Sequence, residues 1–200
     1  MNIMFFASPW WVNGGFLVPI AAFLYWRGRG LDFRPGQLAA LTAFGVAFGF
    51  VEAAVVVYLR AATGLLPGFQ SGFAEVVRQS SALYRQTALL QFLAAPPKVL
   101  VTVELFREAA TMAMLVAIAW LAGRRWRERS AAFLYAFAFW DIFYYVFLWL
   151  LVRWPQSLKT VDVLFLIPVP WVSQVWYPIL VSGLSIAAVI AGSSAGRGTS

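Results

Sequence analysis

The chain has 200 residues, of which 62% are hydrophobic and 12% are charged, whereas an ordinary soluble domain has roughly 45–50% and about 25%. It contains no cysteine and no histidine, which excludes disulfides, haem or zinc ligation by these residues, and Ser-His or Cys-His nucleophile pairs. The formal net charge is +7. The basic residues flank apolar runs instead of covering a soluble face, so no nucleic-acid partner is expected.

This composition predicts an integral membrane protein that forms a single domain over residues 1–200, with the lipid bilayer as its first partner. A helix needs about 20 mostly apolar residues to cross a bilayer. Five runs meet that length, so we predict an all-α fold, a polytopic bundle of about five transmembrane helices. The runs cover residues 4–26, 38–60, 99–122, 131–152 and 163–191. The N-terminal run lacks the basic start of a secretory signal, and we interpret it as a retained span.

The second run contains one acidic residue, Glu52, which follows Gly45 and Gly49. A charge inside a span costs roughly 2.5–3.5 kcal/mol on insertion scales, so such groups normally face protein or a wet cavity. The G-x-x-x-G spacing lets a neighbouring helix approach closely. We therefore expect Glu52 to face the interior of the bundle.

Residues 71–94, between the second and third runs, place apolar side chains at helical spacing with glutamate, arginine and glutamine between them. This pattern predicts one amphipathic helix that lies in the membrane interface. Two interpretations stay open for it: a connector on the membrane surface, or a lid over a site that opens outward.

The third run begins with three charges, Glu104, Arg107 and Glu108, in the stretch VELFREAATMAML. Residues three and four apart share one face of a helix, so these side chains project together. In the fourth run Asp141 has Tyr144 and Tyr145 at the same spacings. With a rise of about 1.5 Å per residue, all the charges from the three runs lie ~8 to ~17 Å below the outer boundary. The sequence thus predicts one shared polar cluster.

The fifth run starts with LFLIPVPW, in which Pro168 and Pro170 make a regular helix improbable, because proline lacks an amide donor and clashes with the preceding turn. This part is predicted to be an unwound or interfacial piece that leads into a span near 172–191. Its residues are candidates for the mouth of the site: Asp162, Pro168, Pro170 and Trp171.

The predicted cluster holds four carboxylates and one arginine, an excess of three negative charges that a low dielectric does not sustain. Protonation, a bound cation, or a basic residue such as Arg60, Arg85 or Lys98 could neutralise it. We expect Arg107 to tether Glu104 or Glu108, with Glu52 and Asp141 as exchangeable groups. Cofactors are not specified by the sequence; a metal would need oxygen ligands, which favours Mg, Ca or Mn. Its candidate ligands are Glu52, Glu104, Glu108 and Asp141.

Arginines gather in the links after the first and third runs, RGRGLDFR and GRRWRER. Loops rich in lysine and arginine stay in the cytoplasm. We therefore predict a multi-pass protein of the inner (plasma) membrane, with the N-terminus outside and the C-terminus inside. The inverted orientation is the alternative.

Mid-membrane carboxylates are typical of proton and cation relays, so we expect a proton- or cation-linked membrane subunit or small carrier. Five spans are few for a transporter acting alone, and we expect a homo-oligomer or other membrane subunits as partners. One alternative is a membrane enzyme that acts on a lipid or isoprenoid through carboxylates, with or without Mg or Mn. The usual Asp-x-x-Asp and HxxxH spacings are missing. A second alternative is a structural subunit or assembly factor, in which the charges only fix helix packing.

The segments REAATMAML, FWDIFYYVFLWLL and LFLIPVPW together resemble parts of a group of small bacterial polytopic membrane proteins with no assigned function. The resemblance covers roughly residues 104–180. It implies a bacterial inner membrane protein and supplies no activity, cofactor or catalytic residue.

Overall fold

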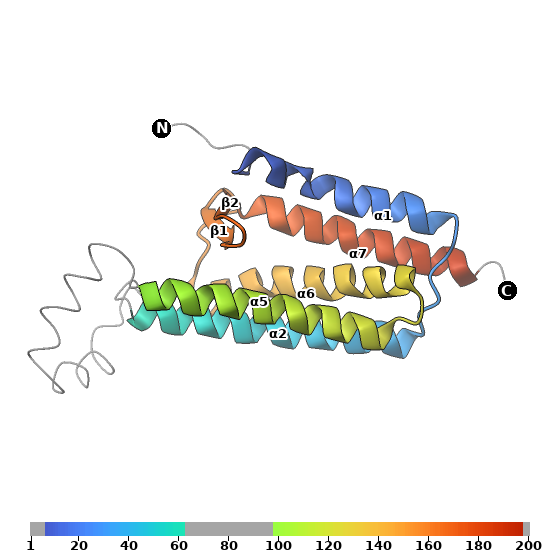
Figure 1. The fold of residues 1–200 in the computed structure, drawn as a ribbon, viewed down its shortest axis with the longest axis horizontal. Coiled ribbons are helices and arrows are strands. Elements are labelled where there is room, and N and C mark those ends of the chain that lie inside the picture. Colours follow the sequence, from blue (N-terminus) through green and yellow to red (C-terminus); the bar gives the residue numbers. More distant parts are fainter. Residues whose placement is uncertain (1–6, 63–97, 198–200) are drawn as a thin grey trace, which may run out of the picture.

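The computed structural model describes residues 7–62 and 98–197, so the amphipathic helix predicted over 71–94 lies outside the described residues. The chain is a bundle of long helices with one small β-hairpin at an end of the bundle (Figure 1). In chain order the elements are the 3-10 helix η1 (Trp10–Phe16), α1 (Leu17–Arg27), α2 (Pro35–Ala62), α5 (Lys98–Ala122), α6 (Trp126–Val152), β1 (Val161–Phe165), β2 (Trp171–Gln174) and α7 (Trp176–Arg197).

Four helices of the described part of the chain are long and apolar enough to cross a membrane, and this confirms the predicted all-α polytopic class. These helices are Pro35–Arg60, Thr102–Ala122, Trp126–Val152 and Trp176–Ser194. The α6 helix begins five residues before the predicted 131, because the Glu128 carboxylate accepts the backbone N–H groups of Arg124 and Arg125, both at 3.0 Å. An acidic side chain in the first turn stabilises a helix N-terminus.

The N-terminal segment differs from the single span predicted over 4–26. Its described part is the seven-residue η1 followed by the 11-residue α1, and α1 alone rises only ~16 Å. Asn13, Gly14 and Gly15 are poor helix formers, and the Asn13 side chain bonds the backbone of Ala7 and Trp10 instead. The segment still follows α7 from one end to the other (Figure 1).

The α6 helix is the centre of the bundle, with α7 on one side and α2 and α5 on the other (Figure 1). Gly45 and Gly49 let α2 approach α6, as the G-x-x-x-G spacing predicts. A Cβ at Gly45 would lie 2.6 Å from the Phe139 Cβ, and one at Gly49 would lie 2.9 Å from the Trp140 carbonyl oxygen. This close packing fixes the position of α6 side chains along the axis of α2.

The first part of the run predicted over 163–191 is a β-hairpin and not a helix. β1 and β2 pair antiparallel, with Asp162 opposite Ser173 and Phe165 opposite Trp171. Pro168 and Pro170 lie exposed in the connecting turn, where a missing amide donor costs no ladder hydrogen bond. Ser8 exchanges backbone hydrogen bonds of 2.8 Å with Val172. The hairpin therefore ties the N-terminal segment to the start of α7.

The two ends of the bundle differ in charge. The links between α1 and α2 and between α5 and α6 lie at the end opposite the hairpin, where the Leu31 N–H donates to the Gly192 carbonyl oxygen at 3.0 Å. These links carry Arg27, Arg29, Arg34, Arg124, Arg125, Arg127 and Arg129. Among the acidic residues of the described helices, Glu128 lies at the arginine-rich end, in the first turn of α6, whereas Glu108 lies toward the hairpin, where it accepts the Leu166 amide.

Candidate functional site

A cavity of about 430 Å³ opens among α2, α5, α6, α7, η1 and the hairpin. Cavities that bind small molecules range over roughly 300–1,000 Å³, with mostly apolar walls and a few polar groups. Every member of the predicted polar cluster lines this cavity: Glu52, Glu104, Arg107, Glu108, Asp141, Tyr144 and Tyr145. The cavity brings side chains from five helices and the hairpin to one space.

The predicted mouth residues divide into two pairs. Asp162 and Trp171, on the two strands, line the cavity. Pro168 and Pro170 lie in the exposed turn and are not among the described residues that line it. Arg60, expected as one source of neutralising charge, also lines the cavity and lies 4.1 Å from the Trp154 ring centre. Arg85 and the Lys98 side chain fall outside the described residues.

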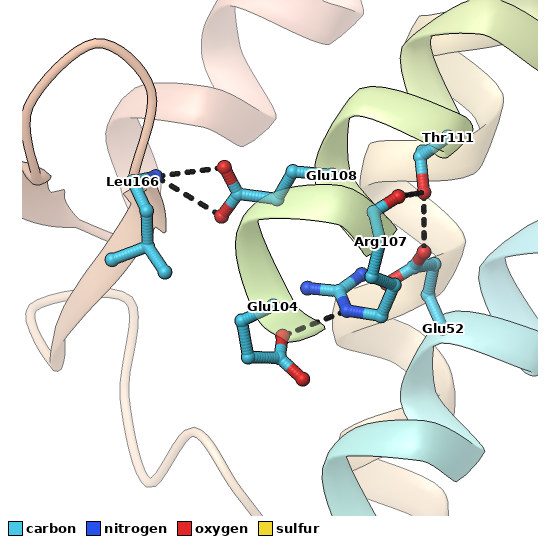
Figure 2. A network of polar contacts seen from close by, with 6 residues as sticks. All are labelled: Glu52, Glu104, Arg107, Glu108, Thr111 and Leu166. Atoms are coloured by element: carbon cyan, nitrogen blue, oxygen red, sulfur yellow. Dashed lines mark hydrogen bonds and ion pairs between the residues drawn. The ribbon is translucent and has the colours of Figure 1, made fainter. Parts of the chain in front are cut away.

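Arg107 on α5 pairs with two carboxylates, Glu104 on the same helix and Glu52 on α2 (Figure 2). Its Nε donates to Glu104 Oε2 at 2.7 Å, and its Nη1 forms an ion pair with Glu52 Oε2. The Thr111 hydroxyl donates to the other Glu52 oxygen at 2.9 Å. Arg107 therefore tethers Glu104 as expected, but it also pairs with Glu52, which was expected to be free of it. One turn of α5 places Arg107 and Thr111 on the same face, opposite Glu52.

Glu108 holds the hairpin, as Figure 2 shows. Both of its carboxylate oxygens accept the backbone N–H of Leu166, at 3.0 and 2.9 Å. Leu166 directly follows β1. A carboxylate that accepts a backbone N–H makes one of the stronger hydrogen bonds in proteins. Glu108 is thus a structural link between α5 and the hairpin that covers the cavity.

Asp141 lies near the middle of α6 and faces the cavity. Its Oδ2 accepts a hydrogen bond of 2.8 Å from the Ser182 hydroxyl on α7. Within the described part of the chain no lysine or arginine is in ion-pair contact with it, and its charged neighbour is Asp162. Of the acids in the predicted cluster, Asp141 combines access to the cavity with a neutral side-chain partner.

Asp162 approaches the same space from β1. The Tyr145 hydroxyl donates to its Oδ2 at 3.0 Å. Burial raises the pKa of Asp162 above the ordinary value, while the Tyr145 hydrogen bond and the charge of Arg60 act in the opposite direction. Tyr145 is buried and its ring lies edge-on to Tyr144, with 4.9 Å between centres. Both predicted tyrosines thus belong to the wall between Asp141 and Asp162.

The sequence did not single out three contributors to the site. These are the hydroxyls of Thr111 and Ser182 and the Leu166 amide. The sequence did contain a signal for Thr111, because it lies four residues after Arg107 and therefore on the same face of the helix. The aromatic wall formed by Phe137, Trp140 and Phe165 was also missed. No signal in a uniformly apolar helix distinguishes rings that line a cavity from rings that face lipid.

The geometry does not favour a metal centre. In the described residues no group of three or more acidic side chains is arranged to hold a metal ion. Two of the candidate ligands, Glu52 and Glu104, already share Arg107. A carboxyl group beside a cavity can still exchange a proton or bind a cation of a ligand.

Comparisons with protein-family models, with curated proteins and with solved structures found no match. The resemblance to small bacterial membrane proteins therefore stays a prediction. The function of the chain has to be argued from the cavity and its charges.

Proposed function

We propose that this protein is a proton-linked component of the plasma membrane, a small carrier or a carrier subunit, with Asp141 as its exchangeable acid. One observation carries the proposal. Asp141 opens onto a cavity of about 430 Å³, and its side-chain partner is the Ser182 hydroxyl. In the described residues no cation neutralises it by direct contact.

The cost of burying a charge explains why this arrangement favours exchange. An isolated carboxylate in a low-dielectric interior is very costly, so the group takes up a proton or a cation instead. A purely structural acid would have a fixed partner that stabilises its ionised form, as Glu52 and Glu104 have in Arg107 and Glu108 has in the Leu166 amide. Asp141 can exchange its neutralising partner through the cavity, and exchange of this kind is the elementary step of proton-linked transport.

The other charged groups have supporting roles in this proposal. Arg107 is saturated by two carboxylates and fixes α2 against α5. Glu108 positions the hairpin over the cavity through Leu166. Asp162 and Tyr145 form a second acid and hydroxyl pair at the cavity wall. Movement of the hairpin would change access to Asp141.

The orientation that we propose places the hairpin end outside. The arginine-rich links lie at the opposite end, and such links remain in the cytoplasm. The cavity would then open toward the outer side of a bacterial inner membrane. Partner subunits, either further copies of this chain or other membrane proteins, complete a carrier of this small size.

A second candidate is an enzyme that acts on a lipid or isoprenoid. The mostly apolar lining of the cavity favours it, because such a wall fits an apolar substrate. Asp141 would then act as a general acid or base. The metal-dependent form of this candidate has little support, since the described residues hold no group of three acids suited to a metal. A structural subunit would need neither the cavity nor an exchangeable acid.

Infrared spectroscopy of the protein in lipid tests the proposal. The carbonyl band of protonated carboxyl groups should decrease reversibly as the pH is raised, and Asp141→Asn should remove one component of this titrating signal, leaving the component of Asp162, whose pKa is raised by burial. Glu104→Gln is the matched control, because it removes a carboxyl that lines the same cavity but is paired with Arg107. A titrating band of full size in Asp141→Asn would refute the role of Asp141.

A further inference from the structure

The cavity lining is acidic even after its internal ion pairs are counted. Five carboxyl groups line it, those of Glu52, Glu104, Glu108, Asp141 and Asp162, and the two arginines there are Arg60 and Arg107. Full ionisation would leave an excess of three negative charges. A wall of this sign attracts cations and repels phosphates and carboxylates by several kcal/mol in a desolvated space.

The apolar part of the lining is aromatic and continuous. The ring centre of Phe165 lies 6.3 Å from that of Phe137, 6.2 Å from that of Trp140 and 5.5 Å from that of Trp171. All four rings line the cavity. The negative faces of aromatic rings attract cations, tryptophan most strongly, and cages of such rings recognise quaternary ammonium groups.

Trp140 adds an independent indication of a ligand. Its side chain is only 9% exposed, and its indole nitrogen has no hydrogen-bond partner in the described part of the chain. Buried donors are nearly always paired, so an unpaired one on a cavity wall calls for an acceptor. An oxygen atom of a bound molecule could supply that acceptor.

From the charges, the rings and the volume together, we infer that the cavity binds an organic cation: an amine or quaternary ammonium compound with an apolar body. This inference rests on the proposed function and names its substrate class. The cationic head lies beside Asp141 and against the faces of the rings around Phe165, and the apolar body occupies the rest of the cavity.

The exchange is balanced in charge. When the cation enters, the Asp141 carboxyl releases its proton to solvent through the cavity, and the resulting carboxylate pairs with the cation. No covalent bond other than the O–H bond changes. When the cation leaves, the carboxyl takes up a proton again. Proton and cation therefore compete for one site, which couples their movements in opposite directions.

Other ligand classes fit less well. A phosphorylated lipid or isoprenoid would bring negative charge into a lining that already has an excess of it. An inorganic cation would need several oxygen ligands, whereas the described residues contain no group of three acids arranged for a metal. A neutral apolar molecule would use the rings and leave Asp141 without a partner.

Titration calorimetry on the protein in nanodiscs can test the inference with three probes of similar shape. Benzyltrimethylammonium is the cation, neopentylbenzene is its neutral isostere, and phenylacetate is the anion; empty nanodiscs correct for partition into lipid. We expect saturable binding of the cation alone. Runs in buffers of different ionisation enthalpy should give about one proton released per bound cation, because one charge replaces another.

Variants separate the contributions. Asp141→Asn should weaken benzyltrimethylammonium binding at least tenfold and abolish proton release. Phe165→Leu keeps an apolar side chain but removes the central ring, and should weaken binding by about fivefold to thirtyfold. Asp32→Asn is the matched control, because it removes an exposed acid from the link between α1 and α2 at the opposite end.

The outcomes distinguish the two proposals. Selective binding of the cation with proton release supports both. Selective binding without proton release supports the organic-cation site and overturns the proton-linked function. Equal binding of the cation and neopentylbenzene, or binding of neither, overturns the inference. In that case a carboxyl band that titrates and depends on Asp141 would leave the proposed function standing.

Discussion

At the scale of single residues, the site works through unequal neutralisation of similar groups. Glu52 and Glu104 share the guanidinium of Arg107, and Glu108 accepts an amide. Asp141 accepts a hydrogen bond from the Ser182 hydroxyl. A cation or a backbone amide stabilises a carboxylate as an ion, whereas a single hydroxyl in an apolar interior does so far less. In the proposed function, the same chemical group is therefore a fixed tether at Glu52, Glu104 and Glu108 and an exchange group at Asp141.

Asp162 gives a pH prediction. Because burial raises its pKa in the folded protein, its ionised form destabilises the fold. The neutral form of Asp162 is the one that the fold favours. Its contribution to stability is fully present below the ordinary pKa of about 3.9 and is lost as the pH rises through the raised pKa. Asp162→Asn should remove this loss and keep the Tyr145 hydrogen bond, since an amide oxygen also accepts.

Unfolding of both proteins in detergent over a pH series measures the effect. The stability of Asp162→Asn relative to wild type should increase with pH, and Gln156→Ala is a control at an exposed position of the link that precedes β1. A wild-type protein that gains stability over the variant as the pH rises would contradict this account of Asp162.

The charged residues could be found from the sequence because an ionisable group in an apolar run is itself a signal. The neutral partners of these residues could not be found from the sequence. Serines in spans commonly bond their own helix, as Ser185 does with the Val181 carbonyl and Ser193 with the Val189 carbonyl. Only the fold shows that Ser182 points to Asp141 instead. The pairing of Arg107 with Glu52 likewise depends on how α2 and α5 approach each other.

At the scale of elements, the site depends on two contacts: the close approach of α2 to α6 and the attachment of the hairpin to α5. The sequence indicated the first through G-x-x-x-G. It indicated the second only as a proline break, because the strand residues of VDVLF merge with the apolar run that follows. Length and hydropathy alone therefore assigned the hairpin to a fifth span.

Gly49→Ala tests the approach of α2 to α6. Its Cβ would lie 2.9 Å from the backbone of Trp140 and of Tyr144, so the helices must separate. We expect a loss of about 1–3 kcal/mol in the free energy of unfolding, measured by denaturant titration in detergent.

Gly183→Ala is the matched control for that substitution. It lies in α7, where a Cβ would meet nothing within 4 Å, so alanine should stabilise the helix by about 1 kcal/mol. Equal effects of the two substitutions would mean that α2 does not pack closely on α6.

Glu108→Ala tests the attachment of the hairpin. Loss of the acceptor for the Leu166 amide should cost about 1–3 kcal/mol and speed hydrogen exchange in the hairpin roughly tenfold or more. Glu104→Ala removes the same charge from the same helix without a bond to the hairpin, and should leave this exchange rate unchanged. If Glu108→Ala leaves hairpin exchange as slow as in wild type, the carboxylate does not hold the hairpin.

At the scale of the whole molecule, the bundle has a basic end and an acidic end. Arginines fill the links at one end, and the cavity with its carboxyl groups lies toward the hairpin at the other. The N-terminal segment runs alongside α7 between these ends in two pieces. This polarity is readable from the sequence, since it follows from the order of apolar runs and arginines.

The absence of cysteine makes the orientation easy to measure. We expect Gln156→Cys, in the exposed link between α6 and β1, to react with a membrane-impermeant maleimide on intact cells. Asp32→Cys, exposed in the link between α1 and α2, should react only after the membrane is permeabilised. The reverse pattern would place the cavity on the cytoplasmic side.

The central claim is that the cavity beside Asp141 is a site for exchange and not a gap in packing. A density map of the protein in lipid, recorded with benzyltrimethylammonium, tests it most directly. The account predicts density for the cation between Asp141 and the rings around Phe165, with the Ser182 contact nearby. A map in which protein side chains fill this space and a lysine or arginine contacts Asp141 would contradict it.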